Sequence, residues 1–194
     1  YLLVNDRNIN TVAKAAGKKI AVLDYDEAQK IMASQVGAQA VSSDITNFGA
    51  KFNNGQVDII GAPAVVFRPL ELHKGLGDKG AIINYPILQV TGNIIIHPEK
   101  FPEGYGQKSR DWVKNQLPRA FGILGKMKSD IPQKYWMNVP VGDQAGYQKM
   151  MRESRVDLTK RGVYDKRMMK LLWQFRCKEN SKNFECSLQD ENYK

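Results

Sequence analysis

Short strand and helix patterns alternate through the first half of the chain, and this order constrains the possible fold more than any other feature. The patterns follow one another at residues 18–23 (strand), 27–35 (helix), 38–42 (strand), 45–52 (helix), 57–63 (strand) and 64–76 (helix). A repeated order of short strands and helices is typical of a parallel-type sheet with helices on its faces. The sequence therefore predicts an α/β protein.

Residues 81–96 continue as one long β-prone segment, which Pro86 and Gly92 interrupt. Because a central strand does not carry proline in its middle, we expect two strands here, or one long bent strand. Beyond this segment the patterns change to long helices, which we expect at 107–127, 143–155 and 157–176.

The positive charge is concentrated in the second half of the chain. Residues 1–100 hold ten Lys and Arg against nine Asp and Glu, whereas residues 101–194 hold 19 against 11, so the second half carries +8 of the net +9. With 42% hydrophobic and 25% charged residues, the composition is that of a globular protein rather than a disordered one. Its longest apolar runs are too short to span a membrane.

The motifs of enzymes and metal sites are absent or occur in the wrong context. Residues 75–80 match the glycine pattern of a dinucleotide site, but they follow a helix and precede a strand, so we interpret them as a helix end and a turn. His73 and His97 lack metal-ligand spacing. No Gly-x-Ser-x-Gly sequence is present. We therefore expect no enzyme, no cofactor and no metal site.

Acidic residues follow the first two predicted strands. Asp24 and Asp26 form a pair that suits either acid–base chemistry or helix capping, and strand-end aspartates more often cap the helix that follows. Asp44 opens the next helix in the same way. An α/β-class enzyme remains an alternative at this stage, although no reactive nucleophile accompanies the carboxylates.

Cys177 and Cys186 lie nine residues apart in a polar tail after the last helix. A zinc site would need further ligands close by, and the tail offers none. We therefore predict a disulfide formed in an oxidising compartment, with two free cytosolic thiols as the alternative.

A basic run extends from Arg152 to Lys178. Its last part is amphipathic, with Arg167 and Lys170 on one face and Leu171 and Phe175 on another. Since it contains no nucleic-acid-binding motif and no pattern of stacking aromatics, we expect a solvated helix face and no nucleic-acid partner.

Two segments resemble a known family. Residues 17–22 (Gly-Lys-Lys-Ile-Ala-Val) resemble the entry strand of DctP-type periplasmic solute-binding proteins of TRAP transporters. Residues 47–58 resemble their element in which a helix leads through Gly into a strand that begins Val-Asp, here Val57-Asp58. The resemblance covers most of residues 17–176. It is nearest to a divergent, AdeT-like branch, some of whose members are labelled as efflux-associated and linked to aminoglycoside resistance.

The resemblance implies a periplasmic-binding-protein-like (type II) α/β lobe with a mixed sheet, followed by C-terminal helices. On this basis residues 1–105 are the ligand-binding lobe. Residues 106–194 are a C-terminal helical region that completes the lobes and ends in the disulfide-closed tail. The family has a substantial N-terminal lobe before the entry strand, so we expect this chain to be a truncated or processed form that lacks it.

The resemblance also departs from the family at its ligand-binding position. The family strand usually carries an Arg that pairs with a substrate carboxylate, and the matching residue here is Ala21. Arg68 is a candidate substitute, although on a helix over 64–76 it would face solvent. We therefore expect a neutral or cationic ligand.

In α/β folds, ligands bind at the carboxyl ends of the strands. The candidate ligand-binding residues lie at those ends, together with Arg68: Asp24, Tyr25, Asp26, Ser43, Asp44, Ala62, Pro63, Arg68, Asn84 and Tyr85.

The predicted function is that of a periplasmic solute-binding protein, or a truncated form of one, that captures a small polar solute for membrane transporter subunits. Two alternatives remain: an efflux-associated accessory protein linked to aminoglycoside resistance, and a polyanion- or nucleic-acid-binding module that uses the basic C-terminal helices.

Overall fold

A six-stranded mixed sheet forms the centre of the molecule in a computed structural model that describes residues 1–89, 92–188 and 190–193. The strands are β1 (Leu2–Val4), β2 (Lys19–Leu23), β3 (Gln39–Ser43), β4 (Ile59–Gly61), β5 (Ala81–Ile83) and β6 (Trp136–Met137). Their order across the sheet is β3-β2-β4-β1-β5-β6. Only β1 is antiparallel to its neighbours, and the other strands all run in one direction.

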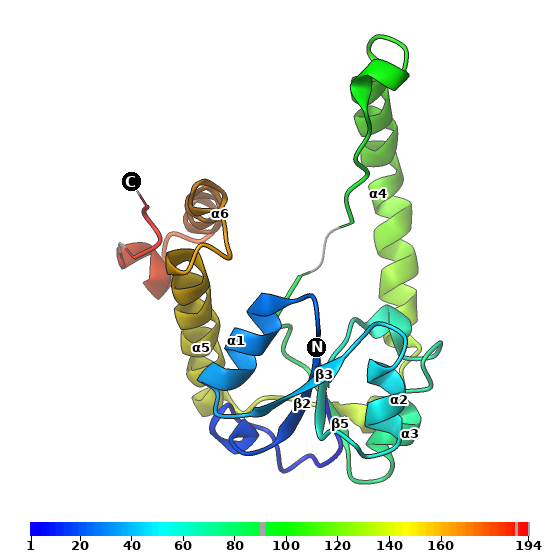
Figure 1. The fold of residues 1–194 in the computed structure, drawn as a ribbon, viewed down its shortest axis with the longest axis vertical. Coiled ribbons are helices and arrows are strands. Elements are labelled where there is room, and N and C mark those ends of the chain that lie inside the picture. The colour runs from blue at the N-terminus through cyan, green and yellow to red at the C-terminus, as the bar shows by residue number, and fades with distance from the viewer. Residues whose placement is uncertain (90–91, 189, 194) are drawn as a thin grey trace.

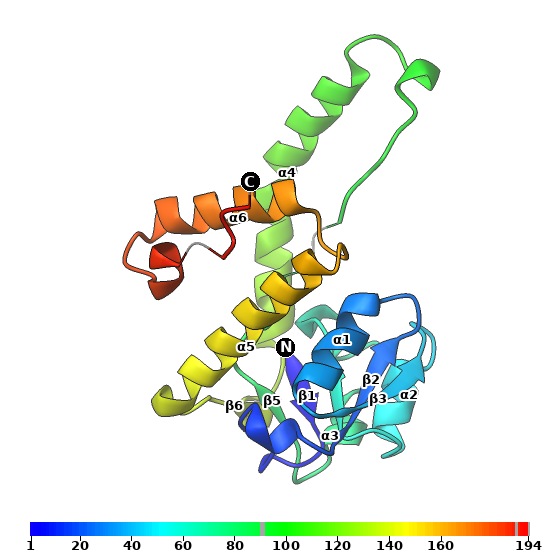
Figure 2. The same cartoon turned by 60° about the vertical axis from the view of Figure 1, so that its left-hand side comes forward.

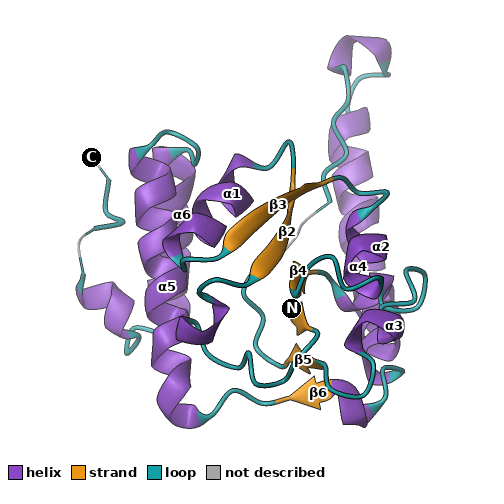
Figure 3. Ribbon diagram, turned by 60° about the horizontal axis from the view of Figure 1, so that its bottom comes forward, coloured by secondary structure: helices purple, strands orange, loops and turns teal. Residues whose placement is uncertain are grey.

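Helices cover both faces of this sheet (Figure 3). Their bounds are α1 (Glu27–Gln35), α2 (Phe48–Asn53), α3 (His73–Leu76), α4 (Tyr105–Ser129), α5 (Val141–Lys160) and α6 (Lys166–Glu179). Helices α1 and α5 lie on one side of the sheet, and α2, α3 and the lower part of α4 lie on the other. This three-layer arrangement confirms the predicted α/β class.

Alternation along the strands gives each face its own hydrophobic core. In β1, Leu3 packs into the core beneath α2 and α3, whereas Val4 packs into the core on the side of α5. Successive side chains of a strand point to opposite faces, so β1, β2, β4, β5 and β6 contribute to both cores, whereas β3 contributes Val41 to the first core only.

Two helical arms extend from the sheet layer (Figures 1 and 2). The chain leaves the carboxyl end of β5, runs to a tip near Gly104 and returns along the 25-residue helix α4. On the other side, α5 leads up to α6 and the C-terminal tail. Helix α4 contains no buried residue, and Trp112, Leu117 and Phe121 are exposed on it.

The prediction of one helix over residues 64–76 is wrong. The structure has a short 3-10 turn at Ala64–Val66, then turns, and then the four-residue helix α3. Pro69 accounts for the break, because proline lacks a donor N–H and disfavours helical geometry at the preceding residue. Glu71 adopts a φ of 49°, which a regular right-handed helix does not permit.

The expectation of two strands, or of one long bent strand, over residues 81–96 is also wrong. Only β5 forms, and a tight turn in which the Tyr85 N–H donates to Ile83 O (2.7 Å) ends it before Pro86. Residues 90–91 of this segment lie outside the described residues, and 92–96 contain no strand.

The expected boundary between the last two helices is displaced as well. Helix α5 continues to Lys160, and the break falls at Gly162, whose φ is +77°.

Candidate functional site

The carboxyl ends of five strands meet at one edge of the sheet. Because β2, β3, β4, β5 and β6 run in the same direction, the residues that follow them gather there. The structure thus brings nearly all the predicted ligand residues to a common edge, which we call the strand-end edge. It is built by residues 24–26, 43–44, 62–63, 84–85 and 138.

Asp24, Tyr25 and Asp26 form the turn between β2 and α1. Asp26 caps α1 by accepting a hydrogen bond from the Gln29 N–H (3.0 Å), which confirms the capping interpretation for this residue. Asp24 accepts a hydrogen bond from the Ser42 hydroxyl (2.5 Å) at the end of β3 and remains exposed. Tyr25 is 71% exposed. Asp24 and Tyr25 are therefore accessible to a solute.

Asp44 organises the turn that leads into α2. Its carboxylate accepts hydrogen bonds from the backbone N–H groups of Thr46 (2.7 Å) and Asn47 (3.1 Å) and from their side chains. The bonds from Thr46 are the main cause that lowers the pKa of Asp44. Ser43 beside it is only 1% exposed and donates to Val41 O (3.2 Å). Ser43 is therefore a buried structural residue beneath the strand-end edge.

Ala62 and Pro63 continue from β4 beside the start of β1. Ala62 is buried, and its carbonyl accepts a hydrogen bond from the Tyr1 amine (3.0 Å). Next to these residues lies an apolar cavity of about 10 Å³, whose lining includes Phe67 and Trp136. Such a volume holds one water molecule at most, so this cavity is too small for an organic solute.

Asn84 and Asn138 form an exposed amide pair at the ends of β5 and β6. The Asn84 side-chain amide donates to Asn138 Oδ1 (2.9 Å), and the Asn84 backbone N–H donates to Met137 O (2.8 Å). Asn138 was not among the predicted residues. Its place depends on the pairing of β5 with β6, which brings residues 54 positions apart together.

Tyr85 packs against Tyr147 of α5, with ring centroids 5.4 Å apart. Burial, and to a smaller extent the charge of Asp143, raises the pKa of Tyr147 to about 12. Tyr147 is therefore a neutral structural group beneath the edge, and Tyr85 is held half-buried between this core and the surface.

Arg68 does not join the other predicted residues. It is exposed, and its guanidinium pairs with the Asp130 carboxylate (3.8 Å) beyond the end of α4. This ion pair holds the Arg68 guanidinium beside the C-terminal end of α4.

A larger groove, of about 750 Å³, lies at the opposite end of α1, where α1 packs against α5. Gln35 spans this junction: it accepts a hydrogen bond from the Ser154 hydroxyl (2.7 Å) and donates to Asp157 (2.7 Å). None of the predicted ligand residues lines this groove.

The predicted disulfide is present and joins Cys177 to Cys186.

The basic run between Arg152 and Lys178 is partly neutralised within the molecule. Arg152 pairs with Asp190, and Arg155 and Arg176 both pair with Glu191. Lys166 and Arg167 remain exposed at the start of α6.

Among residues 1–89, 92–188 and 190–193, the structure shows no group of three or more His, Cys, Asp or Glu side chains placed to hold a metal ion. Within the same residues, no helix is both long enough and apolar enough to cross a membrane.

Comparison with known families provides the decisive observation. Residues 1–191 match the family model of the solute-binding protein AdeT 1/2. The chain belongs to this family. It is 60% identical, over 191 residues, to a protein of Acinetobacter baumannii named "Probable solute-binding protein AdeT1", and 29% identical over 187 residues to "Probable solute-binding protein AdeT2" of the same species.

The match covers 98% of this chain but 63% of AdeT1, and 96% of this chain with 79% of AdeT2. Among solved structures, the fold is similar to a TRAP periplasmic solute-binding protein from Desulfovibrio salexigens with bound orotic acid. The TM-score is 0.61 at 17% identity, and the match covers 88% of this chain and 57% of that one. This likeness confirms the fold, which is the one expected from residues 17–22 and 47–58.

Proposed function

We propose that this chain carries the solute-contacting lobe of a periplasmic solute-binding protein that captures a small polar solute for membrane transporter subunits. The single observation that carries the proposal is the strand-end edge of a solute-binding-protein fold, along which Asp24 and Tyr25 after β2 and the Asn84–Asn138 pair after β5 and β6 are all exposed. Periplasmic residence agrees with the Cys177–Cys186 disulfide, since such bonds persist in oxidising compartments.

The two parts of the chain contribute differently to the proposed site. Residues 1–105 contribute the edge except for Asn138, and residues 106–194 contribute Asn138, strand β6 and the helices that extend past the edge (Figure 1). In the complete protein, closure of a second lobe around a hinge would enclose the solute against the edge. Relatives such as AdeT1 extend beyond the matched region, which leaves room for such a lobe.

The charge of the edge favours a neutral or cationic solute. Asp24, Asp26 and Asp44 lie there, and the cation Lys51, which lies close enough to Asp44 to lower its pKa, donates to Ser42 O. Arg68 is paired with Asp130 instead. A dicarboxylate would meet net negative charge at this position, and like charges repel.

Calorimetric titration of the chain with putrescine, kanamycin and malonate tests the proposal. We expect the amines to bind and malonate not to bind. Asp24→Asn and Asn84→Ala are each expected to weaken amine binding by about tenfold, through loss of a charge-assisted or neutral hydrogen bond. Glu153→Gln, in the distant groove, serves as the matched control and leaves the affinity unchanged.

Two results would contradict the proposal at different points. Tight malonate binding that is lost in Arg68→Ala, without amine binding, would reverse the expected charge of the solute. Amine binding that responds to Glu153→Gln but not to Asp24→Asn would move the site to the groove between α1 and α5.

A further inference from the structure

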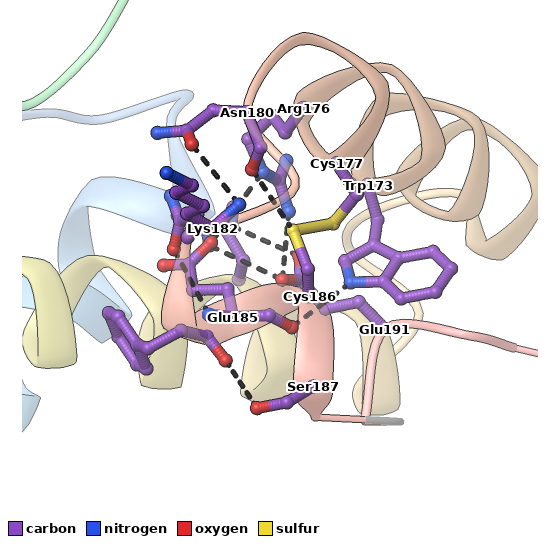
Figure 4. Close-up of a disulfide and its surroundings, with 12 residues drawn as sticks. Trp173, Arg176, Cys177, Asn180, Lys182, Glu185, Cys186, Ser187 and Glu191 are labelled. Carbon is purple, nitrogen blue, oxygen red and sulfur yellow. Dashed lines mark hydrogen bonds and ion pairs between the residues drawn. A yellow bond between two sulfur atoms is a disulfide. The ribbon is translucent and has the colours of Figure 1, made fainter.

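The described part of the C-terminal tail, residues 180–188 and 190–193, crosses back over the pair formed by α5 and α6. It turns through a short 3-10 helix at Phe184–Ser187 and brings two carboxylates, Glu185 and Glu191, against these helices. Figure 4 shows the tail folded under the end of α6, with the disulfide at its centre. Glu191 is 2% exposed, which is unusual for a carboxylate at a chain end.

Glu191 bridges the two helices. Its carboxylate accepts a hydrogen bond from Arg155 Nε of α5 (3.1 Å) and another from Arg176 of α6 (2.8 Å). Glu185 lies between the same two cations, 2.8 Å from Arg155 and 3.6 Å from Arg176. Two arginines and two carboxylates therefore form a closed cluster that ties the tail to α5 and α6 together.

Few large apolar side chains support this attachment: in the described tail, the half-buried Tyr193 is one of them. Phe184 and Leu188, the large apolar side chains of the described tail that flank the turn, are both exposed. The indole N–H of Trp173 donates to Glu185 O (3.2 Å), which is a polar contact as well. Ordering a segment with so few buried apolar groups requires an additional constraint, because backbone order has an entropic cost at every residue.

The Cys177–Cys186 bond provides that constraint. It joins α6 directly to the short 3-10 helix and confines the chain between them to a small loop. In this loop the Asn183 side chain accepts from the Glu185 N–H (3.0 Å), so the closed loop places Glu185 in front of Arg155. Both cysteines are half-exposed, so the disulfide lies near the surface of the molecule.

We propose that Cys177–Cys186 is a thiol–disulfide exchange site whose oxidation state controls the docking of the tail. A dithiol would attack one sulfur of the pair and displace the other as a thiolate. Its second thiol would then resolve the mixed disulfide. Two electrons and two protons pass to Cys177 and Cys186, and the dithiol leaves as its own disulfide. The tail then separates from α5, and Arg155 and Arg176 become exposed while the sheet layer stays folded.

Hydrogen exchange measured on the whole chain, with and without dithiothreitol, tests this inference. After reduction we expect amides of residues 180–188 to exchange at least about tenfold faster, because the loop constraint is gone. Amides of β2 and β4 are expected to keep their rates. Mass spectrometry verifies the reduction through the gain of two hydrogens.

The double variant Cys177→Ser/Cys186→Ser is the matched control. It contains no thiol, so its tail is expected to exchange fast with or without dithiothreitol. Trp173 offers a second readout, since loss of its hydrogen bond to Glu185 O should shift its fluorescence, and the shift should be absent from Trp173→Phe.

Unchanged exchange of the tail in the reduced protein would overturn the inference, because the ionic cluster alone would then hold the tail. Equal acceleration in the tail and in β2 would overturn it too, since reduction would then loosen the whole fold. Both outcomes are independent of solute binding at the strand-end edge.

Discussion

Gly80, which precedes β5, lies against two backbone segments. A Cβ atom at this position would be 2.5 Å from Leu76 O and 2.6 Å from Val4 O, closer than real contacts permit. Backbone atoms cannot rotate away, so Gly80→Ala should force α3 and β1 apart. We expect a loss of about 2 kcal/mol in the free energy of unfolding, the usual range for overpacking, measured by urea denaturation.

Gly61 offers the matched control for this substitution. It lies in β4, and a Cβ atom there would have no neighbour within 4 Å. Gly61→Ala should therefore be neutral or slightly stabilising, since alanine restricts the unfolded chain. Equal losses in the two variants would show that the close approach at Gly80 does not decide the effect.

Asp26 leads to a second prediction at this scale. Its carboxylate accepts the Gln29 N–H, so Asp26→Ala leaves a helix N-terminus uncapped. We expect a loss of about 1 kcal/mol in the free energy of unfolding, and recovery of most of it in Asp26→Asn, which keeps an acceptor. Urea denaturation of both variants measures this. Failure of asparagine to recover stability would assign the effect to charge instead of capping.

The residue-scale predictions from sequence succeeded where the cause is local. The capping of α1 by Asp26 depends on the next three residues alone. The expectation that Asp44 opens a helix at residue 45 is wrong: Asp44 binds the N–H groups of the turn before α2, which begins at Phe48 with Asn47 as its N-cap. Asn138 was missed, and the partner of Arg68 was not foreseen, because both arise from contacts across more than 50 residues. A composition or spacing rule does not encode such contacts.

At the scale of elements the same distinction holds. The bounds of α1 agree with the expectation because its polar cap and apolar period are both local. Strand β1 was missed: three apolar residues form a strand here only because β4 and β5 offer edges on either side. This insertion makes the sheet mixed, as the resemblance to solute-binding proteins implied. The short α3 forms in place of the predicted long helix because Pro69 breaks the helical pattern before it.

The free energy that docks the tail on α5 and α6 depends on pH. Burial alone would raise the pKa of Glu191, but the hydrogen bonds and charges of Arg155 and Arg176 outweigh it and lower the pKa below the ordinary 4.5. A lowered folded pKa means that this contribution is present above pH 4.5 and is lost as the pH falls through the lowered value. We expect Trp173 fluorescence to report release of the tail on acid titration below pH 4.5.

Glu191→Gln separates this contribution from general acid unfolding. Without the carboxylate, the change in Trp173 fluorescence below pH 4.5 should disappear. The free energy that docks the tail at pH 7 should fall by about 2 kcal/mol. Glu179→Gln, at the exposed end of α6, is the matched control and should titrate like the parent chain. An identical acid transition in Glu191→Gln would remove Glu191 as its source.

At the scale of the whole molecule, the hydrophobic cores and the exposed apolar side chains lie in different regions. Both hydrophobic cores lie against the sheet, whereas α4 and α6 extend from it with many apolar side chains exposed (Figure 2). The strand-end edge lies between these regions. The positive charge that dominates the second half of the sequence belongs to the projecting helices, and part of it is neutralised by the tail.

Two phenylalanines test this separation. Phe52, a residue of α2, is fully buried against α3, and Phe52→Ala should lower the free energy of unfolding by about 4 kcal/mol through loss of burial and creation of a cavity. Phe121 on α4 is 66% exposed, so Phe121→Ala should change it by less than about 0.5 kcal/mol. Urea denaturation followed by circular dichroism measures both. If Phe121→Ala proved as costly as Phe52→Ala, the arm would have to be part of the cooperative core, because a side chain that is exposed in the folded chain has little burial to lose.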